Sequence, residues 1–478
     1  MYYYLFYASF IVLFSLSIPV QAVLPNKVYG VNLGSWLVLE SWMLPQGWLD
    51  MGGQQCSDCS KCIATEFAFA RAYPDTVDEV FNKHWSSWFN QTDVNALVEA
   101  GINTVRIPLG YWIVEALVNR TTEFYPRGGI SHLKRGLKEL KNCWYRVQTP
   151  GQMFTGRCTS DVEFYVSYLL FQRDVIRNSV ISIRLITTYH RALVWTAVMT
   201  TLSHLDPDFS NVIAIEAVNE PIMNATQTPG YGDFQKNFVQ VVRAVEQTLG
   251  VSGPWSWPNW PTMTGTDASD VILAMENTTS SSSNPKVQLA LKDAMPIITD
   301  IGMELGWSDM KRMFASLYNR EPLYTRRRFS FMDINWQNSN PANPSAAQSG
   351  PQVYDNHLYY SFGGVADANE QAYMTSICNL QRVQADADLG NSPLVFGEWA
   401  LTTQFTASDA FLIKWADAQK LAYTKGAGWI FWNFKVENST LSGDLGRQWS
   451  YLEGVQRGYF SRDPSKLHDT HVCDAYIQ

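Results

Sequence analysis

Short apolar segments rich in β-branched residues recur along this chain, separated by longer stretches whose apolar residues follow helical spacing. Seven of the segments have the length and composition of buried strands: residues 28–33, 101–108, 212–218, 329–334, 353–359, 394–398 and 428–434. Helical patterns occur between them, among others at residues 92–100, 192–204, 233–249 and 407–425. Strands that alternate with helices favour a parallel sheet, because the chain must cross over between neighbouring parallel strands.

The order of these elements predicts one closed architecture. A (β/α)8 barrel with insertions reaches the length of this chain, 478 residues, as one domain. We therefore predict an α/β protein, a TIM barrel, that occupies residues 23–478. Such a barrel needs an eighth strand, and we expect the missing one between Arg106 and Val212, where the pattern is poorest.

The amino-acid composition indicates a folded protein and limits the kinds of partner that it can bind. Hydrophobic residues make up 46% of the chain and charged residues 17%, which is typical of a large folded core. The formal net charge is −8 with Lys and Arg scattered, so no basic surface for nucleic acid is expected. The 18 Trp, 23 Tyr and 24 Phe residues suit a sugar ligand, although most of them are expected in the core. We expect a monomer without cofactor or metal.

The amino terminus resembles a secretory signal. Residues 1–22 form an apolar run that closes on Val20-Gln21-Ala22, with small residues at the cleavage positions. No Lys or Arg precedes the run, so an uncleaved anchor is the alternative; no later apolar stretch is long enough to span a membrane. We predict a protein secreted outside the cell or into the cell wall. Glycosylation sequons agree with this route and stand at Asn90, Asn119, Asn224, Asn277 and Asn438.

The seven cysteines could bind a metal or form disulfides. Cys56, Cys59 and Cys62 could be three zinc ligands, but no further ligand follows at zinc-finger spacing. An oxidising route favours disulfides instead, and we predict that Cys378 pairs with Cys473. The odd number leaves at least one thiol free or intermolecular.

Two segments each lead an apolar strand into a carboxylate. Ile213–Pro221 contains Glu220 and Leu394–Trp399 contains Glu398, each near the carboxyl end of its strand. A parallel barrel keeps its chemistry at that end, and two facing carboxylates can cleave a glycosidic bond. Asn219 adds an amide that can bind a substrate hydroxyl beside Glu220. A single Glu at a strand end would usually be a surface residue, so the prediction depends on the pair.

Six motifs, in order along residues 28–435, resemble glycoside hydrolase family 5 and, within it, the fungal exo-β-1,3-glucanases. They are Tyr29–Trp42, Asn103–Trp112, Glu216–Pro221, Asp355–Tyr359, Phe396–Trp399 and Gly428–Phe434. The resemblance implies a secreted, retaining hydrolase that releases glucose from 1,3-linked β-glucan. It also implies that the two catalytic carboxyls lie about 5–5.5 Å apart.

The resemblance assigns a role to each matching residue. Glu220 would be the acid/base and Glu398 the nucleophile. Arg106 would keep Glu398 ionised by lowering its pKa, although an Arg at a strand end is more often part of a surface ion pair. His357 and Tyr359 would point at the nucleophile and the sugar, although a His at such a position is usually packed in the core.

Two further residues are assigned to the sugar. Glu40 would bind hydroxyls of the terminal glucose, with a solvated loop acid as the alternative. Trp432 would form the floor on which the sugar stacks, with core packing as the alternative.

The chain departs from the family between its second and fourth strands. Family members have a third strand that ends in a Leu-His-x-x-Pro-Gly motif, which is missing here, and residues 166–188 form an insertion that fits nothing in the family. We therefore expect a defective third strand, either real or the product of a gene-model error near Cys143 and Val166. Residues 144–148 and 180–186 are the candidate replacements. Unpaired groups on the neighbouring strands would make the chain less stable and weakly active.

Three functions stay open at this stage. The first is hydrolysis of 1,3-linked β-glucan, and the second is hydrolysis of 1,6-linked or mixed β-glucan. The third is a wall protein that binds carbohydrate but is catalytically impaired by its third strand. The sequence does not separate exo from endo cleavage.

Overall fold

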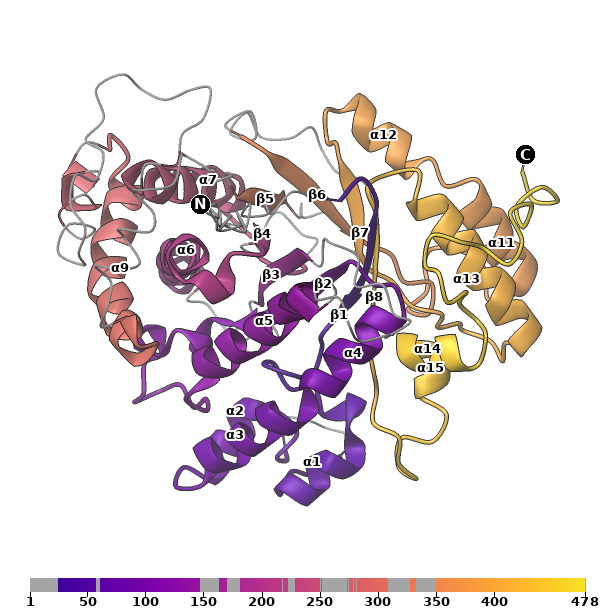
Figure 1. The fold of residues 1–478 in the computed structure, drawn as a ribbon, viewed down its shortest axis with the longest axis horizontal. Coiled ribbons are helices and arrows are strands. Elements are labelled where there is room, and N and C mark those ends of the chain that lie inside the picture. Colours follow the sequence, from indigo (N-terminus) through magenta and orange to yellow (C-terminus); the bar gives the residue numbers. More distant parts are fainter. Residues whose placement is uncertain are drawn as a thin grey trace, which may run out of the picture.

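The computed structural model describes residues 25–56, 61–146, 163–169, 181–216, 218–221, 228–249, 251, 273, 275–277, 279–280, 282–307, 327–331 and 350–477. In these residues, parallel strands close into an eight-stranded barrel in the order β1 to β8, with β8 paired to β1 (Figure 1). The strands are β1 Val28–Asn32, β2 Thr104–Gly110, β3 Glu163–Leu169, β4 Val212–Glu216, β5 Arg328–Phe331, β6 Gln352–His357, β7 Leu394–Glu398 and β8 Gly428–Phe431. The predicted TIM barrel is therefore the observed architecture.

Helices surround the barrel in Figure 1. The helices before β4 are η1 Ser41–Met43, α1 Pro45–Met51, α2 Glu66–Ala72, α3 Val77–Trp88, α4 Gln91–Glu99, η2 Tyr111–Ile113, η3 Glu115–Leu117, α5 Gly129–Arg146, α6 Ile181–Leu205 and η4 Pro207–Phe209. The later ones are α7 Tyr231–Thr248, α9 Pro285–Glu304, α11 Glu370–Cys378, α12 Arg382–Asp388, α13 Asp409–Tyr423, α14 Gly446–Trp449 and α15 Tyr451–Gln456. Polar caps define several of their starts; Asn90 and Asp93 form a capping box on α4, and Ser408 caps α13.

A third strand is present, as β3. It pairs with β2 along its whole length and with β4 from Phe164 to Ser167. The predicted unpaired edges of the second and fourth strands are therefore not found. Both candidate replacement strands were wrong, because residues 144–146 end α5 and residues 181–186 begin α6. The expected insertion at 166–188 contributes to β3 and α6, and residues 170–180 lie outside the described residues.

The seven predicted strands are confirmed, with shorter ends in several cases. The segment 212–218 stops being a strand at Glu216, and 428–434 stops at Phe431. The register of β6 against β7 shifts between Asn356 and His357. β6 ends at His357, so Tyr359 lies beyond the strand. These ends lead directly into the polar residues described below.

The barrel interior changes from apolar to charged along the strand direction. A compact cluster of buried side chains fills it near the start of the strands: Val28, Ile213, Ala214, Val353, Val395 and Ile430. Side chains two residues apart on a strand face the same side. Two residues after Ala214 and Val353, the same interior positions therefore hold Glu216 and Asp355, which are fully buried. This second layer is the floor of the site.

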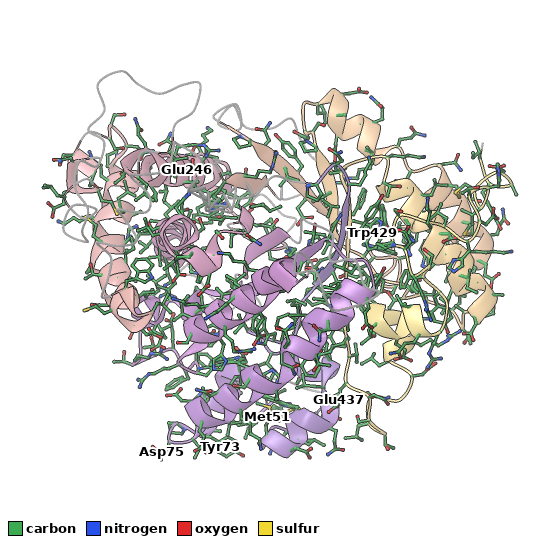
Figure 2. The ribbon with its side chains drawn as sticks, in the orientation of Figure 1. Met51, Tyr73, Asp75, Glu246, Trp429 and Glu437 are labelled. Carbon is green, nitrogen blue, oxygen red and sulfur yellow. A yellow bond between two sulfur atoms is a disulfide. The ribbon has the colours of Figure 1, made fainter. Side chains whose placement is uncertain are left out.

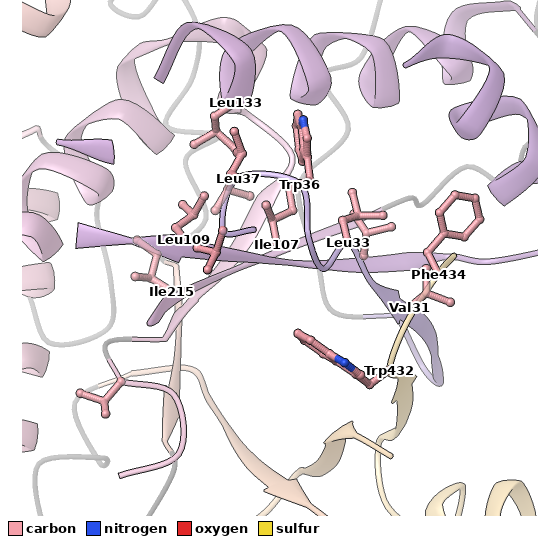
Figure 3. Packing of buried hydrophobic residues seen from close by; sticks show 14 of the residues in the cluster. Val31, Leu33, Trp36, Leu37, Ile107, Leu109, Leu133, Ile215, Trp432 and Phe434 are labelled. Carbon is pink, nitrogen blue, oxygen red and sulfur yellow. The ribbon is translucent and has the colours of Figure 1, made fainter. Parts of the chain in front are cut away.

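The large core lies between the barrel and its helices (Figures 2 and 3). Leu33, Trp36 and Leu37 follow β1 and pack near Ile107, Leu109 and Leu133 (Figure 3). Trp36 also donates a hydrogen bond of 2.9 Å to the carbonyl of Trp85 on α3. Trp429 of β8, the strand paired with β1, is fully buried and contacts the rings of Tyr29 and Trp399; it is labelled in Figure 2. The segment after β1 is thus anchored to the helical layer.

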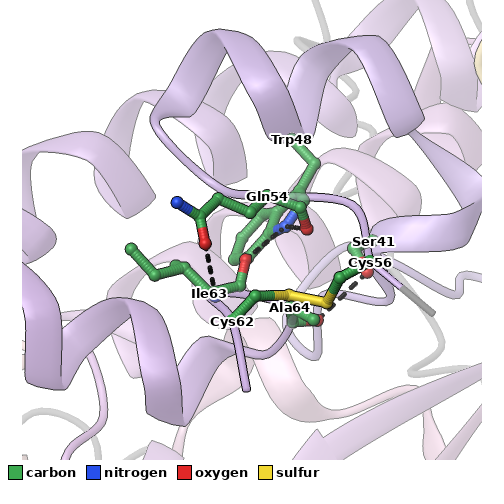
Figure 4. Close-up of a disulfide and its surroundings, with 7 residues drawn as sticks. All are labelled: Ser41, Trp48, Gln54, Cys56, Cys62, Ile63 and Ala64. Carbon is green, nitrogen blue, oxygen red and sulfur yellow. Dashed lines mark hydrogen bonds between the residues drawn. A yellow bond between two sulfur atoms is a disulfide. The ribbon is translucent and has the colours of Figure 1, made fainter. Parts of the chain in front are cut away.

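Two disulfides secure loops around the barrel. Cys378 at the end of α11 is bonded to Cys473, which confirms the predicted pair. Cys56 is bonded to Cys62 in the loop after α1 (Figure 4), so these two cysteines are not zinc ligands. Cys59, Cys158, the predicted signal at 1–22 and the Asn224 sequon lie outside the described residues. Among the residues described, none of the helices has the length and apolar character that crossing a membrane requires.

Candidate active site

Arg106 of β2 lies at the centre of the polar layer. Its side chain is 1% exposed and contacts carboxylates from three other strands. Nη2 donates to Glu216 at 2.8 Å, Nη1 donates to Glu398 at 2.7 Å, and Nε lies 3.7 Å from Asp355. Burial disfavours the charge of Arg106, but Glu216 and Glu398 outweigh that effect and raise its pKa. Because an unpaired buried charge is very costly, these groups depend on one another.

Two amides complete the contacts of Arg106. Nη1 also donates to Oδ1 of Asn32 at 2.9 Å, and Nη2 donates to Oδ1 of Asn219. Asn32 in turn donates to the carbonyl of Gly397 at 2.9 Å, which ties β1 to β7 just before Glu398. The oxygen of Asn219 therefore bonds Arg106, which leaves its NH2 group as the part that could reach a substrate hydroxyl.

Glu220 lies in the turn that follows β4. Its backbone has φ +43°, a left-handed conformation that non-glycine residues rarely adopt. Its side chain is 35% exposed, and its Oε1 lies 2.8 Å from Nδ1 of His357. Strained backbone of this kind persists where surrounding structure requires it and is enriched at functional sites. The turn directs one partly exposed carboxylate toward the end of β6.

Glu398, the last residue of β7, is held on both oxygens. Oε1 accepts from Arg106, and Oε2 accepts from the hydroxyl of Tyr359 at 2.9 Å. Nδ1 of His357 is 3.4 Å from Oε2. Burial raises the pKa of Glu398, whereas His357 and Arg106 act in the opposite direction. Arg106 thus lowers the pKa of Glu398 as predicted, but burial is the larger effect and the net pKa is raised.

His357 links the two carboxylates and is charged at neutral pH. Burial lowers its pKa, but Glu398 and Asp355 outweigh burial and raise the pKa to about 10. Burial likewise opposes ionisation of Asp355, but His357 and Arg106 bring its pKa below the usual range. Asp355 also accepts from the backbone N–H of Gly397 at 2.8 Å. A Cβ at position 397 would lie 2.2 Å from Oδ1 of Asp355, so only glycine fits there.

One oxygen from each of Glu220 and Glu398 and one nitrogen of His357 lie within 4.8 Å of one another. These donor types can bind a transition metal. The hydrogen bond between His357 and Glu220 and the ion pair between His357 and Glu398 already account for the closeness of the three groups. The expected absence of a metal and of a cofactor stays a prediction.

Glu40 lies at the edge of this cluster, after β1. It is partly buried, and its Oε2 accepts from Nε1 of Trp42 at 2.8 Å. Burial raises the pKa of Glu40 to about 8; the Trp42 bond opposes this, and Glu398 and Glu220 add to it. Glu40 is therefore within electrostatic reach of both carboxylates and is not a freely solvated loop acid.

Trp432 follows β8 and is 7% exposed. A Cβ on Gly34 would lie 3.1 Å from its ring, so the ring packs against the backbone after β1. In Figure 3 the ring lies apart from the side chains of Leu33 and Trp36. Its predicted role as a sugar platform is untested.

The fold brings the predicted residues Arg106, Asn219, Glu220, His357, Tyr359 and Glu398 into one connected cluster. Sequence reasoning gave no individual role to Asn32, Glu216 or Asp355. A signal was available for Glu216, because it ends a fully buried strand of four apolar residues. A charged residue in such a position needs a buried partner. The catalytic and binding roles of all these residues remain predictions.

Comparisons with known proteins point to carbohydrate hydrolases. No family model matches the sequence. The chain is 26% identical over 472 residues to glucan endo-1,6-beta-glucosidase B of Emericella nidulans, covering 94% of this chain and 88% of that protein. It is 28% identical over 230 residues to probable glucan 1,3-beta-glucosidase A of Aspergillus fumigatus, covering 47% of this chain and 49% of that protein.

Among solved structures, rutinosidase from Aspergillus niger has a TM-score of 0.50 and 16% identity, covering 91% of this chain and 98% of that chain. This likeness supports a shared fold. The expected exo-1,3 subtype is not confirmed, because the relatives that span most of this chain are named as endo-1,6 enzymes.

Proposed function

We propose that this protein is a retaining β-glucan hydrolase of the glycoside hydrolase family 5 type. The observation that carries the proposal is the pairing of Glu220 with Glu398 at the carboxyl ends of β4 and β7, with oxygens within 4.8 Å of each other. Retaining enzymes hold their carboxyls about 5–5.5 Å apart, whereas inverting enzymes leave about 6.5–9.5 Å for a water molecule. The short separation supports a direct attack on the sugar.

The different surroundings of the two carboxylates support different roles. Glu398 is buried and held by Arg106 and Tyr359, so it is fixed for attack as a nucleophile. Glu220 is more exposed and can exchange protons with the leaving group and with water. His357 hydrogen-bonds Glu220 and lies 3.4 Å from Glu398, so it holds the two carboxylates close to each other.

Catalysis would then take two steps. Glu398 attacks the anomeric carbon while Glu220 gives its proton to the departing glycosidic oxygen, which yields a glucosyl ester on Glu398. Glu220 then takes a proton from water, and the resulting hydroxide displaces Glu398. Two inversions leave the anomeric configuration retained.

Two linkages compete as the substrate. Cleavage of 1,6-linked glucan is supported by relatives that match 94% of this chain. Exo cleavage of 1,3-linked glucan is supported by the sequence motifs and by relatives that match 47% of it. The site around Glu398 serves either linkage, because the bond cleaved is always at the anomeric carbon.

Catalytic impairment was expected from a defective third strand. Pairing of β3 with both neighbours removes one reason for that expectation, the unpaired strand edges, whereas the His motif is missing from β3 as the sequence indicated. We therefore favour an active hydrolase over a binding protein. The two disulfides and the similarity to fungal glucan hydrolases support a secreted protein.

The test is product analysis with the purified protein on a linear β-1,6-glucan and on laminarin, a β-1,3-glucan. Glucose as the sole early product indicates exo cleavage, whereas a ladder of oligosaccharides indicates endo cleavage. Proton NMR of the first product should show the β-anomer before mutarotation. Binding to either glucan without release of any sugar would overturn the proposal in favour of a binding protein.

A further inference from the structure

The segment between β1 and η1, residues 33–40, carries Glu40 to the edge of the active site. Ser35 has φ +57° and is fully buried. Its hydroxyl accepts from the backbone N–H of Glu40 at 2.8 Å and donates to the carbonyl of Glu40 at 2.9 Å. Ser35 therefore binds the backbone of Glu40 within the same segment, so a displacement of residues 33–39 would also displace Glu40.

The helical layer outside the barrel holds this segment at two places near its start. Nε2 of His84 on α3 lies 2.7 Å from the carbonyl of Ser35, and Nε1 of Trp88 donates to the carbonyl of Gly34 at 3.1 Å. The N–H of Gly34 donates to Asn433 at 2.8 Å. These bonds fix the first half of the segment.

Glu66 fixes the second half. It is the first residue of α2 and is 5% exposed, and its Oε1 accepts from the backbone N–H of Leu39 at 2.7 Å. Leu39 directly precedes Glu40. Among the described residues, no hydrogen-bond partner is found for Oε2 of Glu66.

Burying a carboxylate with a hydrogen bond to only one of its oxygens costs free energy unless the group is protonated and therefore neutral. Burial raises the pKa of Glu66 to about 8; the Leu39 N–H opposes this and Glu40 adds to it. Glu66 is therefore mostly protonated at neutral pH. A glutamine would reproduce its shape, its neutrality and its oxygen acceptor.

We propose that Glu66 is a positioning residue that orients Glu40 toward the substrate through the N–H of Leu39. The proposal rests on the proposed function, since Glu40 is taken to bind a sugar hydroxyl. Glu66 is buried, and in this proposal its effect reaches the site through the backbone of residues 39–40. Removing the Glu66 acceptor should weaken binding of the sugar equally in the ground state and in the transition state.

The experiment compares Glu66→Met with Glu66→Gln. Glu66→Met keeps the size but removes the acceptor, and it should raise KM about tenfold with kcat changed less than about threefold. Glu66→Gln should restore KM to within about twofold. Asp417→Leu is the matched control, because it removes the acceptor from another buried carboxylate: Asp417 on α13 accepts the backbone N–H of Asp469 at 2.8 Å.

A double-mutant cycle with Glu40→Gln separates positioning from general stability. If Glu66 acts through Glu40, Glu66→Met should raise KM by less than about twofold in a protein that already carries Glu40→Gln. Additive effects, or an equal rise of KM in Asp417→Leu, would overturn the proposal.

Hydrogen exchange gives a readout that needs no activity. The amide of Leu39 should be protected in the native protein and in Glu66→Gln, and it should exchange at least about tenfold faster in Glu66→Met. Unchanged protection in Glu66→Met overturns the positioning role even if the protein hydrolyses glucan. Faster exchange in a protein that hydrolyses no glucan would instead refute the proposed function and leave the Glu66–Leu39 contact intact.

Discussion

Glu398 and Arg106 form a buried ion pair of 2.7 Å between β7 and β2, with side chains 8% and 1% exposed. The two partners are 292 positions apart in the sequence and come together only because β2 and β7 belong to the same closed barrel. The pair joins the proposed nucleophile to the charged layer inside the barrel.

Replacing Glu398 with Gln should keep the fold and abolish turnover, because a neutral amide of the same shape cannot attack the anomeric carbon. Activity on an aryl glucoside measures the loss. In Glu398→Gly, added azide should restore cleavage and give the glycosyl azide of inverted configuration. More than a few per cent of native activity in Glu398→Gln would exclude Glu398 as the nucleophile.

Replacing Glu220 with Ala should damage cleavage of natural glucan far more than cleavage of an aryl glucoside with a good leaving group. General-acid catalysis contributes roughly 10²- to 10⁴-fold where the leaving oxygen is basic and little where it is not. The measurement is kcat/KM on both substrates. Equal losses on the two would contradict the acid/base role.

Arg106→Met should destabilise the protein by about 3–5 kcal/mol, because Glu216, Asp355 and Glu398 would be buried around a missing cation. Urea unfolding measures the change. Lys236→Met is the control: it breaks the exposed pair with Asp233 and should cost less than about 1 kcal/mol. Similar losses in both variants would show that Arg106 is not the centre of a buried network.

Stability should fall on the alkaline side as His357 loses its proton. The pKa of His357 is about 10 in the fold against an ordinary value of 6.5, so the folded protein holds the proton more tightly than the unfolded chain. This stabilisation is fully present below pH 6.5 and is lost as the pH rises through about 10.

The measurement is urea unfolding of the native protein and His357→Asn at pH 6, 8 and 10. The advantage of the native protein over the variant should shrink across this range. The difference in unfolding free energy between the two proteins is compared because Glu40 and Glu66 also have raised pKa values. Their deprotonation destabilises both proteins alike as the pH rises. A constant difference between the two proteins would contradict the prediction.

The sequence by itself determined the barrel and the approximate positions of seven of its strands. Apolar strand segments and helical patterns are local features, so seven strands could be placed within a few residues. Glu220 and Glu398 could be named because each follows such a segment, and parallel strands present their carboxyl ends at one face. The Cys378–Cys473 pair was also predicted correctly.

Only the tertiary structure decided which side chains share the interior. The strand β3 could not be recognised, because its identity depends on pairing with β2 and β4 rather than on its own pattern. Register likewise decides that Asn32, Glu216 and Asp355 surround Arg106. The net direction of the Glu398 pKa depends on burial, which no sequence pattern gives. The hold of Glu66 on Leu39 is a contact across separate elements, and such contacts exist only once the chain has closed.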